Sequence, residues 1–317
     1  MSALRTLVRA GVLASLAACA ASSAEAPPPG DQLIPGFSPP APLANETRVF
    51  SPLVKNIQPG ADLTWCAYIP NPFAAEVDVV NSRGFQSHAG HHAILMDVPG
   101  SESRLGVSRE CTDDDMTNAR FLAGGSDGAA KFRIPEGIAF RIPKGGVLMV
   151  QSHWINTGST AVDGQTVFNV AALPPTPERQ QAQLFAAYTA KVTLPPHGKA
   201  HAFTECTFAK DLSFFAIGGH AHEWGSHVKI TRKRESGDET LYEHDWEPAY
   251  QADPPLNYYE TKSPLRIAKG DTIRLDCDYA NTSTDEIRFP REMCVMEGFY
   301  FPGTSGIECA DGRWLEP

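Results

Sequence analysis

Five histidines and one methionine fall into two groups with the ligand chemistry of a soft metal ion. The groups are His91, His92 and His153, then His220, His222 and Met293. Thioether sulfur suits Cu(I) and imidazole suits copper and zinc, whereas hard, oxygen-seeking ions are disfavoured by both. Imidazoles with one thioether and no carboxylate therefore predict copper. Two such groups in one chain indicate redox chemistry.

The second group begins with a pair of histidines two residues apart. On a strand, His220 and His222 would point to the same face, with Cβ atoms roughly 7 Å apart, so both could reach one ion. Met293 is a candidate third ligand because a disulfide at the adjacent Cys294 would hold it in place, and Met296 is the rival thioether. Taken alone, such a pair in a β protein is more often simply exposed or packed.

The first group requires an irregular backbone. Adjacent residues of a strand point to opposite faces, so His91 and His92 can bind one ion only at a bend or bulge, which Gly90 would permit. His88 could substitute for either or support them. His153 follows the apolar run at 147–151 and would project from a second strand. The alternative for this pair is a polar strand end without metal.

The elements that must position these side chains are predicted to be strands. Short alternating or apolar runs are separated by Gly, Pro, Asn and Asp, and the chain contains 26 Gly and 26 Pro. This pattern predicts an all-β sandwich or jelly roll. The clearest runs are residues 63–69, 147–155, 166–171, 213–217, 227–231 and 272–279.

The N-terminus is typical of an export signal. Two arginines precede an apolar stretch, Ala10 to Ala18, that is much shorter than the ~20 residues of a membrane-spanning helix. Residues 1–19 therefore form a predicted signal peptide, and Cys19 at its end predicts bacterial lipoprotein processing with lipid on this cysteine. Ordinary cleavage near Ala24 is the alternative. Residues 20–45, rich in Ala, Pro and Ser, predict a semi-stiff tether.

The rest of the chain has the length of two ordinary domains. A boundary is predicted at the proline-rich segment 173–179, which gives a first domain at 46–175 and a second at 176–317. This boundary separates the two ligand groups cleanly. Each predicted domain therefore carries one candidate metal site.

Charge and cysteine content restrict the partners and the compartment. The net charge of -10 argues against nucleic acid and against electrostatic binding to anionic lipid. No later segment is apolar enough to span a bilayer, so only a lipid anchor would attach the protein to a membrane. Six cysteines remain after Cys19, and in an exported protein they predict three disulfides among 15 possible pairings.

These fragments resemble the copper type II, ascorbate-dependent monooxygenases, the family of peptidylglycine α-hydroxylating monooxygenase and dopamine β-hydroxylase. The motifs that match, in the family's order, are His91-His92, His153, His220-Ala221-His222 and Met293-Cys294. The resemblance extends over roughly residues 53–301. Any one fragment would be a weak signal, but six ligands in the right order are specific.

The resemblance implies two tandem jelly-roll β-sandwich domains, each with one copper ion. The copper at the first histidine group would store and deliver an electron, and the copper at the second group would be the centre of dioxygen activation and hydroxylation. The family's pattern also implies three disulfides, which are Cys66–Cys111, Cys206–Cys309 and Cys277–Cys294. The last of these would hold Met293 beside the second copper.

The chain departs from the family pattern where peptide-amidating members bind substrate. Those members have an arginine two residues before the His-x-His pair, and an asparagine and a tyrosine after the methionine. Here the corresponding residues are Gly218, Val295 and Glu297. A peptide C-terminus is therefore not the expected substrate, and a neutral or cationic molecule that contacts Glu297 is. A solvated acid is the alternative for Glu297.

The leading hypothesis is an extracytoplasmic copper monooxygenase that hydroxylates an activated C–H of a small organic molecule. It would use O2, two copper ions and an external one-electron reductant, which is ascorbate by analogy with the family. The alternatives are a non-catalytic copper carrier or electron-transfer protein, and a lectin-like or structural jelly roll with incidental histidines.

Overall fold

Antiparallel β-strands make up almost all of the regular structure. The computed structural model describes residues 33–116, 119–125, 132–235, 237–251 and 253–315, and no α-helix occurs among them. The predicted signal peptide, Cys19 and the first part of the tether lie outside these residues. Three short 3-10 helices are present: η1 (Glu102–Arg104), η2 (Asp113–Met116) and η3 (Pro248–Gln251).

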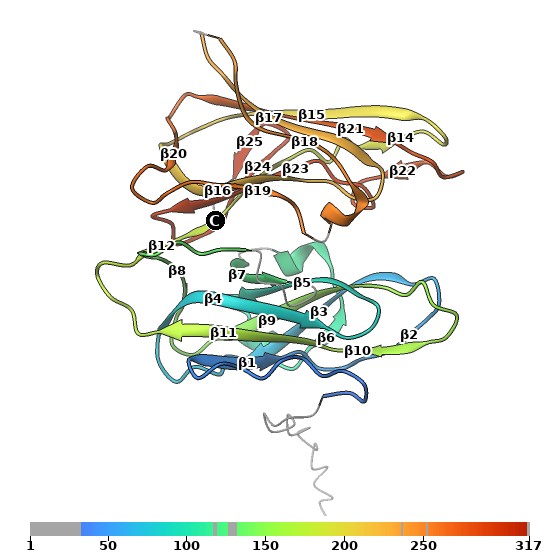
Figure 1. Ribbon diagram of the computed structural model, residues 1–317, viewed down its shortest axis with the longest axis vertical. Coiled ribbons are helices and arrows are strands. Elements are labelled where there is room, and N and C mark those ends of the chain that lie inside the picture. Colours follow the sequence, from blue (N-terminus) through green and yellow to red (C-terminus); the bar gives the residue numbers. More distant parts are fainter. Residues whose placement is uncertain (1–32, 117–118, 126–131, 236, 252, 316–317) are drawn as a thin grey trace, which may run out of the picture. The chain divides into compact units, whose positions relative to one another are not determined.

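The first part of the chain builds two five-stranded sheets (Figure 1). One has the order β1 (Glu46–Phe50), β11 (Thr166–Leu173), β4 (Val77–Gln86), β8 (Ile138–Ile142) and β12 (Gln180–Gln181). The other has the order β6 (Ser108–Glu110), β3 (Asp62–Pro70), β9 (Val147–Ile155), β5 (Gly90–Asp97) and β7 (Arg120–Gly125). A small pair joins β10 (Val162–Gly164) to β2 (Val54–Ile57).

The second part of the chain builds a larger and a smaller sheet. The seven-stranded sheet has the order β19 (Leu256–Tyr258), β16 (Leu212–His220), β23 (Val295–Phe301), β13 (Gln183–Tyr188), β24 (Ile307–Ala310) and β25 (Arg313–Leu315), with β20 (Leu265–Ile267) also on β16. The four-stranded sheet has the order β15 (Lys199–Thr207), β21 (Thr272–Ala280), β17 (Gly225–Lys233) and β18 (Glu239–Asp245). The remaining pair is β14 (Thr193–Leu194) with β22 (Ile287–Arg288).

The all-β prediction is confirmed, and the sheets form two multi-sheet regions. All six segments that the sequence predicts as strands lie within strands of the structure. Strand β15 shows the reason most clearly, because its side chains alternate between exposed and buried along its length. That period of two is what a sheet with one covered face requires. The predicted boundary segment, 173–179, lies between β11 and β12.

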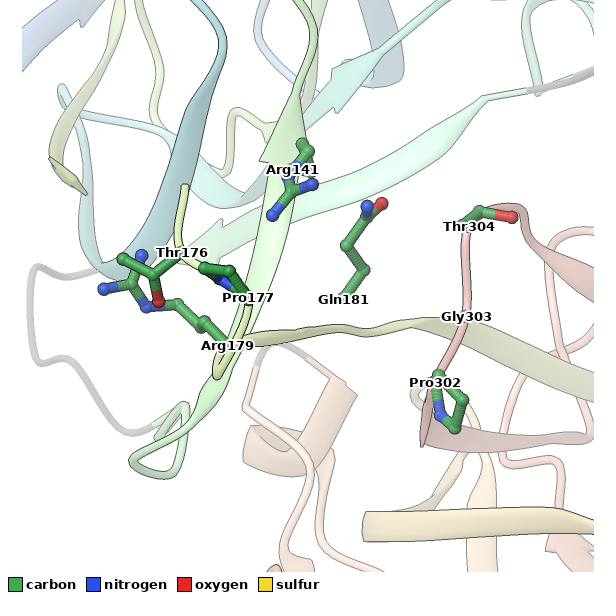
Figure 2. Close-up of a pocket in the computed structure, with 8 residues that line it drawn as sticks. All are labelled: Arg141, Thr176, Pro177, Arg179, Gln181, Pro302, Gly303 and Thr304. Carbon is green, nitrogen blue, oxygen red and sulfur yellow. The ribbon is translucent and has the colours of Figure 1, made fainter. Parts of the chain in front are cut away.

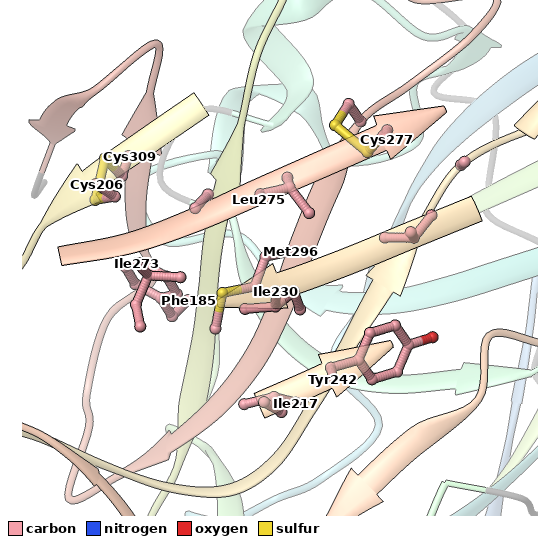
Figure 3. Packing of buried hydrophobic residues seen from close by; sticks show 14 of the residues in the cluster. Phe185, Cys206, Ile217, Ile230, Tyr242, Ile273, Leu275, Cys277, Met296 and Cys309 are labelled. Atoms are coloured by element: carbon pink, nitrogen blue, oxygen red, sulfur yellow. A yellow bond between two sulfur atoms is a disulfide. The ribbon is translucent and has the colours of Figure 1, made fainter. Parts of the chain in front are cut away.

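Strand β23 contributes to two hydrophobic cores. Met296 and Tyr300 belong to the core of the second region, where Figure 3 shows Met296 beside Phe185 and Ile230. Phe299 belongs to a different core, which also contains residues of the first region. Alternate residues of a strand point to opposite faces, so Val295 and Glu297 share the face of Phe299.

The three disulfides are the pairs that the family pattern implies, Cys66–Cys111, Cys206–Cys309 and Cys277–Cys294. They indicate folding in an oxidising compartment outside the cytoplasm. Among the described residues, no helix has the length and apolar character needed to cross a membrane.

Candidate metal centres

The first histidine group converges in space. One ring nitrogen from each of His91, His92 and His153 can be chosen so that all three lie within 4.8 Å of one another. The Nδ1 atoms of His91 and His92 are 3.3 Å apart. Two nitrogens bound at ~2.0 Å to one tetrahedral ion are separated by about that distance. The three imidazoles therefore fit one metal ion, and His88 is not part of the group.

A break in strand pairing brings the two adjacent histidines together. The register of β5 with β9 shifts between Gly90 and His92, so that Gly90 lies opposite Trp154 while His92 lies opposite His153. The predicted irregularity at Gly90 is confirmed. A side chain at this glycine would not fit, because its Cβ would lie 2.2 Å from the Cβ of Gln86.

Burial keeps these imidazoles in the form that binds metal. Desolvation, with a smaller contribution from His153, lowers the pKa of His91 to about 4. Desolvation also lowers the pKa of His92 well below its usual value. Both rings are therefore neutral at pH 7, and neutral imidazole is the ligand form that copper and zinc require.

The second pair of histidines lies at a strand end rather than along a strand. Strand β16 ends at His220, and His222 lies beyond it, just before a turn that leads into β17. The expectation that one strand carries both residues is therefore wrong. The two rings nevertheless lie 5.1 Å apart and nearly perpendicular. Desolvation lowers the pKa of His220 to about 3, so this ring is neutral too.

A buried carboxylate fixes the position of His222 and of the methionine segment. Glu292 is fully buried and accepts hydrogen bonds from the backbone N–H groups of His222 (2.5 Å), Met293 (2.8 Å) and Trp224 (3.0 Å). The Nδ1 of His222 also lies 3.0 Å from the carbonyl oxygen of Arg291. Residues 291–293 are thereby held against the histidine loop.

Met293 is favoured over Met296 as the candidate thioether because its backbone and that of His222 donate to the same Glu292 carboxylate. Val295 lies opposite His220 in the pairing of β23 with β16, and Met293 is two residues before Val295. Met296 lies opposite Gly219 and is buried in the hydrophobic core. The side chain of Met296 therefore packs in the hydrophobic core, and Met293 is the better candidate ligand.

The two centres lie within electrostatic range of each other. After burial and the neighbouring histidine, the charges of His91 and His153 also contribute to the lowered pKa of His220. For His92, the charge of His220 contributes in the same direction. The two histidine groups are therefore near enough that positive charge on one would disfavour positive charge on the other.

Two acidic residues at these centres were not predicted from the sequence. The only sequence signal for Glu292 was that it directly precedes the candidate ligand Met293. Asp62 gave no signal, because it lies 91 residues from its partner, and its carboxylate oxygen is 2.7 Å from Nε2 of His153. Both roles depend on strand pairing that the sequence pattern does not reveal.

Glu297 faces the same side of its sheet as the second centre. It lies opposite Gly218, diagonally from His220, and no hydrogen bond or ion pair to its carboxylate is found in the part of the chain that the structure describes. Desolvation raises its pKa to about 7. The alternative of a solvated acid does not fit the structure, because Glu297 is partly buried.

A pocket elsewhere in the molecule contains none of the candidate ligands. Figure 2 shows its lining, which includes Arg141, Arg179 and Gln181. Both arginines form ion pairs with the buried Asp78. These ion pairs therefore connect β4 with β8 and with the segment that links β11 to β12.

The chain is an all-β protein in which three imidazoles converge where one metal ion would fit, and a second pair of histidine rings lies 5.1 Å apart. Residues 181–312 match the family model described as copper type II ascorbate-dependent monooxygenase, C-terminal domain. The family implies copper. The match contains His220, His222, Met293 and Glu297.

Other comparisons add no functional information. No curated protein matches the chain. One solved structure, from "The Triple Jelly Roll Fold and Turret Assembly in an Archaeal Virus", is 10% identical with a TM-score of 0.24, and the alignment covers 81% of this chain and 59% of that one. The PBSX exported protein XepA is 8% identical with a TM-score of 0.17, covering 82% and 83%. Neither score supports an argument about fold or function.

Proposed function

We propose that this protein is a copper-dependent monooxygenase that hydroxylates a small organic molecule. The balanced reaction takes R–H, O2, two electrons and two protons to R–OH and water. The observation that carries the proposal is the convergence of His91, His92 and His153 in a chain whose residues 181–312 match the copper monooxygenase family model. Incidental histidines would not be expected to converge in this way.

Two sets of side chains would hold the copper ions. His91, His92 and His153 would bind one ion, and His220, His222 and Met293 would bind the other. Bound copper would supply the electrons and the activation of dioxygen that C–H hydroxylation needs. The chain's own contribution is to keep His91, His92 and His220 neutral by burial and to fix the methionine segment through Glu292 and the Cys277–Cys294 disulfide.

The face around Glu297 favours a neutral or cationic substrate. The partly buried carboxylate lacks a partner in the described structure, so an ammonium or hydroxyl group of the substrate would satisfy it. An arginine for a substrate carboxylate has no place at residue 218, because a Cβ there would lie 2.5 Å from Cδ2 of Leu256 and 2.9 Å from the carbonyl oxygen of Pro255. This packing supports the exclusion of peptide C-termini.

The compartment and the reductant complete the proposal. The disulfides agree with an extracytoplasmic protein, and we propose a bacterial lipoprotein that is anchored through Cys19. An external one-electron donor, ascorbate or an equivalent, would supply the electrons. The proposed partners are the substrate and O2, without nucleic acid.

Isotope labelling tests the proposal. Copper-loaded protein is supplied with a reductant and 18O2 and is screened against small amines and alcohols with activated C–H bonds. The expected product carries one 18O atom, and Met293→Ile abolishes its formation while copper remains at the first centre. Protein that retains both copper ions but never couples O2 uptake to a product would instead be a copper carrier.

A further inference from the structure

Asp62 is placed to control the first centre without being part of its ligand group. It lies at the start of β3, where it is opposite Ile155 of β9, while Thr64 is opposite His153. Asp62 and His153 are therefore diagonal neighbours on the same face of the sheet. Asp62 is absent from the group of three histidines whose nitrogens converge.

The hydrogen bond between these residues determines which nitrogen of His153 can bind a metal. The carboxylate oxygen lies 2.7 Å from Nε2, so this nitrogen donates its proton to Asp62. The neutral ring then carries its lone pair on Nδ1. Nδ1 is also the atom through which His91 and His92 approach each other. All three imidazoles could thus bind one ion through Nδ1.

Hydrogen bonds with β9 and with the residue that follows it hold the backbone at Asp62 in place. β3 pairs with β9 throughout its length, from Asp62 to Pro70. Just before Asp62, the backbone of Ala61 accepts a hydrogen bond from Asn156. The carboxylate itself is mostly exposed, so it keeps its negative charge at neutral pH without a large desolvation cost.

We infer that Asp62 is a positioning residue that presents Nδ1 of His153 to the first copper and favours Cu(II) over Cu(I) there. The inference rests on the proposed copper site. A carboxylate that accepts the second N–H of a ligand imidazole makes that ring a stronger donor, and removal of such a partner typically weakens metal binding 10–100-fold. Negative charge beside the ion stabilises the more highly charged Cu(II) state more than Cu(I).

Copper affinity and redox potential test the inference without reference to turnover. The full-length protein with His222→Ala serves as the parent, so that only first-centre copper is measured. Asp62→Ala is expected to weaken Cu(II) binding 10–100-fold and Cu(I) binding much less. A tenfold selective loss of Cu(II) affinity corresponds to a rise of about 59 mV in the one-electron potential.

Two further variants separate the charge from the hydrogen bond and from general effects. Asp62→Asn retains an oxygen acceptor without the charge, so it should lose less Cu(II) affinity than Asp62→Ala and show a correspondingly smaller rise in potential. Glu110→Ala removes an exposed carboxylate from the neighbouring strand β6 and should change neither quantity. Metal-free Asp62→Ala should unfold at a somewhat lower temperature than the parent because buried His153 loses its acceptor, and a single cooperative transition shows that the variant is folded.

The outcomes are distinguishable. If the parent binds copper and Asp62→Ala leaves both the affinity and the potential unchanged, the inference is wrong and the proposed function stands. If the parent binds no copper at this centre, the proposed function fails first. Equal losses of Cu(I) and Cu(II) affinity would also overturn the preference for Cu(II), since they leave the potential unchanged.

Discussion

At the scale of single residues, Met293 is the proposed soft ligand that would distinguish the second centre from the first. Met293→Ile should lower second-centre Cu(I) affinity on the order of tenfold or more, because isoleucine offers no donor atom. Competition against a Cu(I) chelator measures the loss. Met296→Leu is the matched control, since this core substitution should cost less than about 1.5 kcal/mol of stability and leave copper binding intact. If only the Met296 variant lost copper from the second centre, Met296 and not Met293 would be the thioether ligand.

Glu297 makes a prediction about pH. Its pKa is raised from 4.5 to about 7 by burial, so the folded state binds more protons than the unfolded state between these values. This residue therefore destabilises the metal-free protein as pH rises through that window, by at most about 3 kcal/mol above pH 7. Glu297→Gln should stabilise the metal-free protein by about 1–3 kcal/mol at pH 8 and little at pH 5.

Urea unfolding at the two pH values measures this difference. The other ionisable groups are common to wild type and variant, so their contributions cancel in the difference. An equal effect of the substitution at pH 5 and pH 8 would show that Glu297 is already ionised in the folded protein.

The convergence of His91, His92 and His153 was predictable at this scale because the choice of these residues depends on residue type and order. Met293 stays a predicted ligand, which the shared contact with Glu292 favours over Met296. The positions of Asp62 and Glu292 were not predictable. Asp62 acts between neighbouring strands and Glu292 acts between loops, and no local pattern encodes either contact.

At the scale of elements, the ends and irregularities of strands build both centres. A register shift at Gly90 joins His91 to His92, and the end of β16 separates His220 from His222. The first feature was predictable from the glycine and the steric problem of adjacent histidines. The end of β16 was not predictable, because the alternation of apolar and polar residues does not show that the strand stops at His220.

Glu292 is the main anchor of the second centre at this scale. Glu292→Ala would leave three backbone N–H groups without their acceptor, at about 1–3 kcal/mol for each that stays buried and unpaired. The expected result is a loss of about 3 kcal/mol or more in the free energy of unfolding, together with loss of second-centre copper. Copper analysis and denaturant unfolding check both parts, and an unchanged copper content would contradict the anchoring role.

The Cys277–Cys294 disulfide makes a related prediction. Replacing both cysteines by serine should cost about 3 kcal/mol for a loop of this size and should also weaken second-centre copper binding. Removal of Cys206–Cys309, which closes a longer loop in the same region, should cost at least as much stability while copper remains bound. Equal loss of copper in both variants would indicate general unfolding instead.

At the scale of the whole molecule, the two regions share a hydrophobic core, and the two histidine groups interact electrostatically. The all-β class followed from strand periodicity and from the abundance of Gly and Pro. The order of strands in each sheet did not follow, because pairing between distant segments depends on tertiary packing. The placement of the two metal centres within range of each other is a consequence of that packing.

Copper stoichiometry of the purified protein and its variants decides whether the chain holds two copper centres. We expect two copper ions per chain in the wild type and one after His91→Ala with His153→Ala. One is also expected after His220→Ala with His222→Ala, and none when all four are replaced. A wild type that binds a single copper, or a first-centre variant that still binds two, would show that the two histidine groups are not separate copper sites.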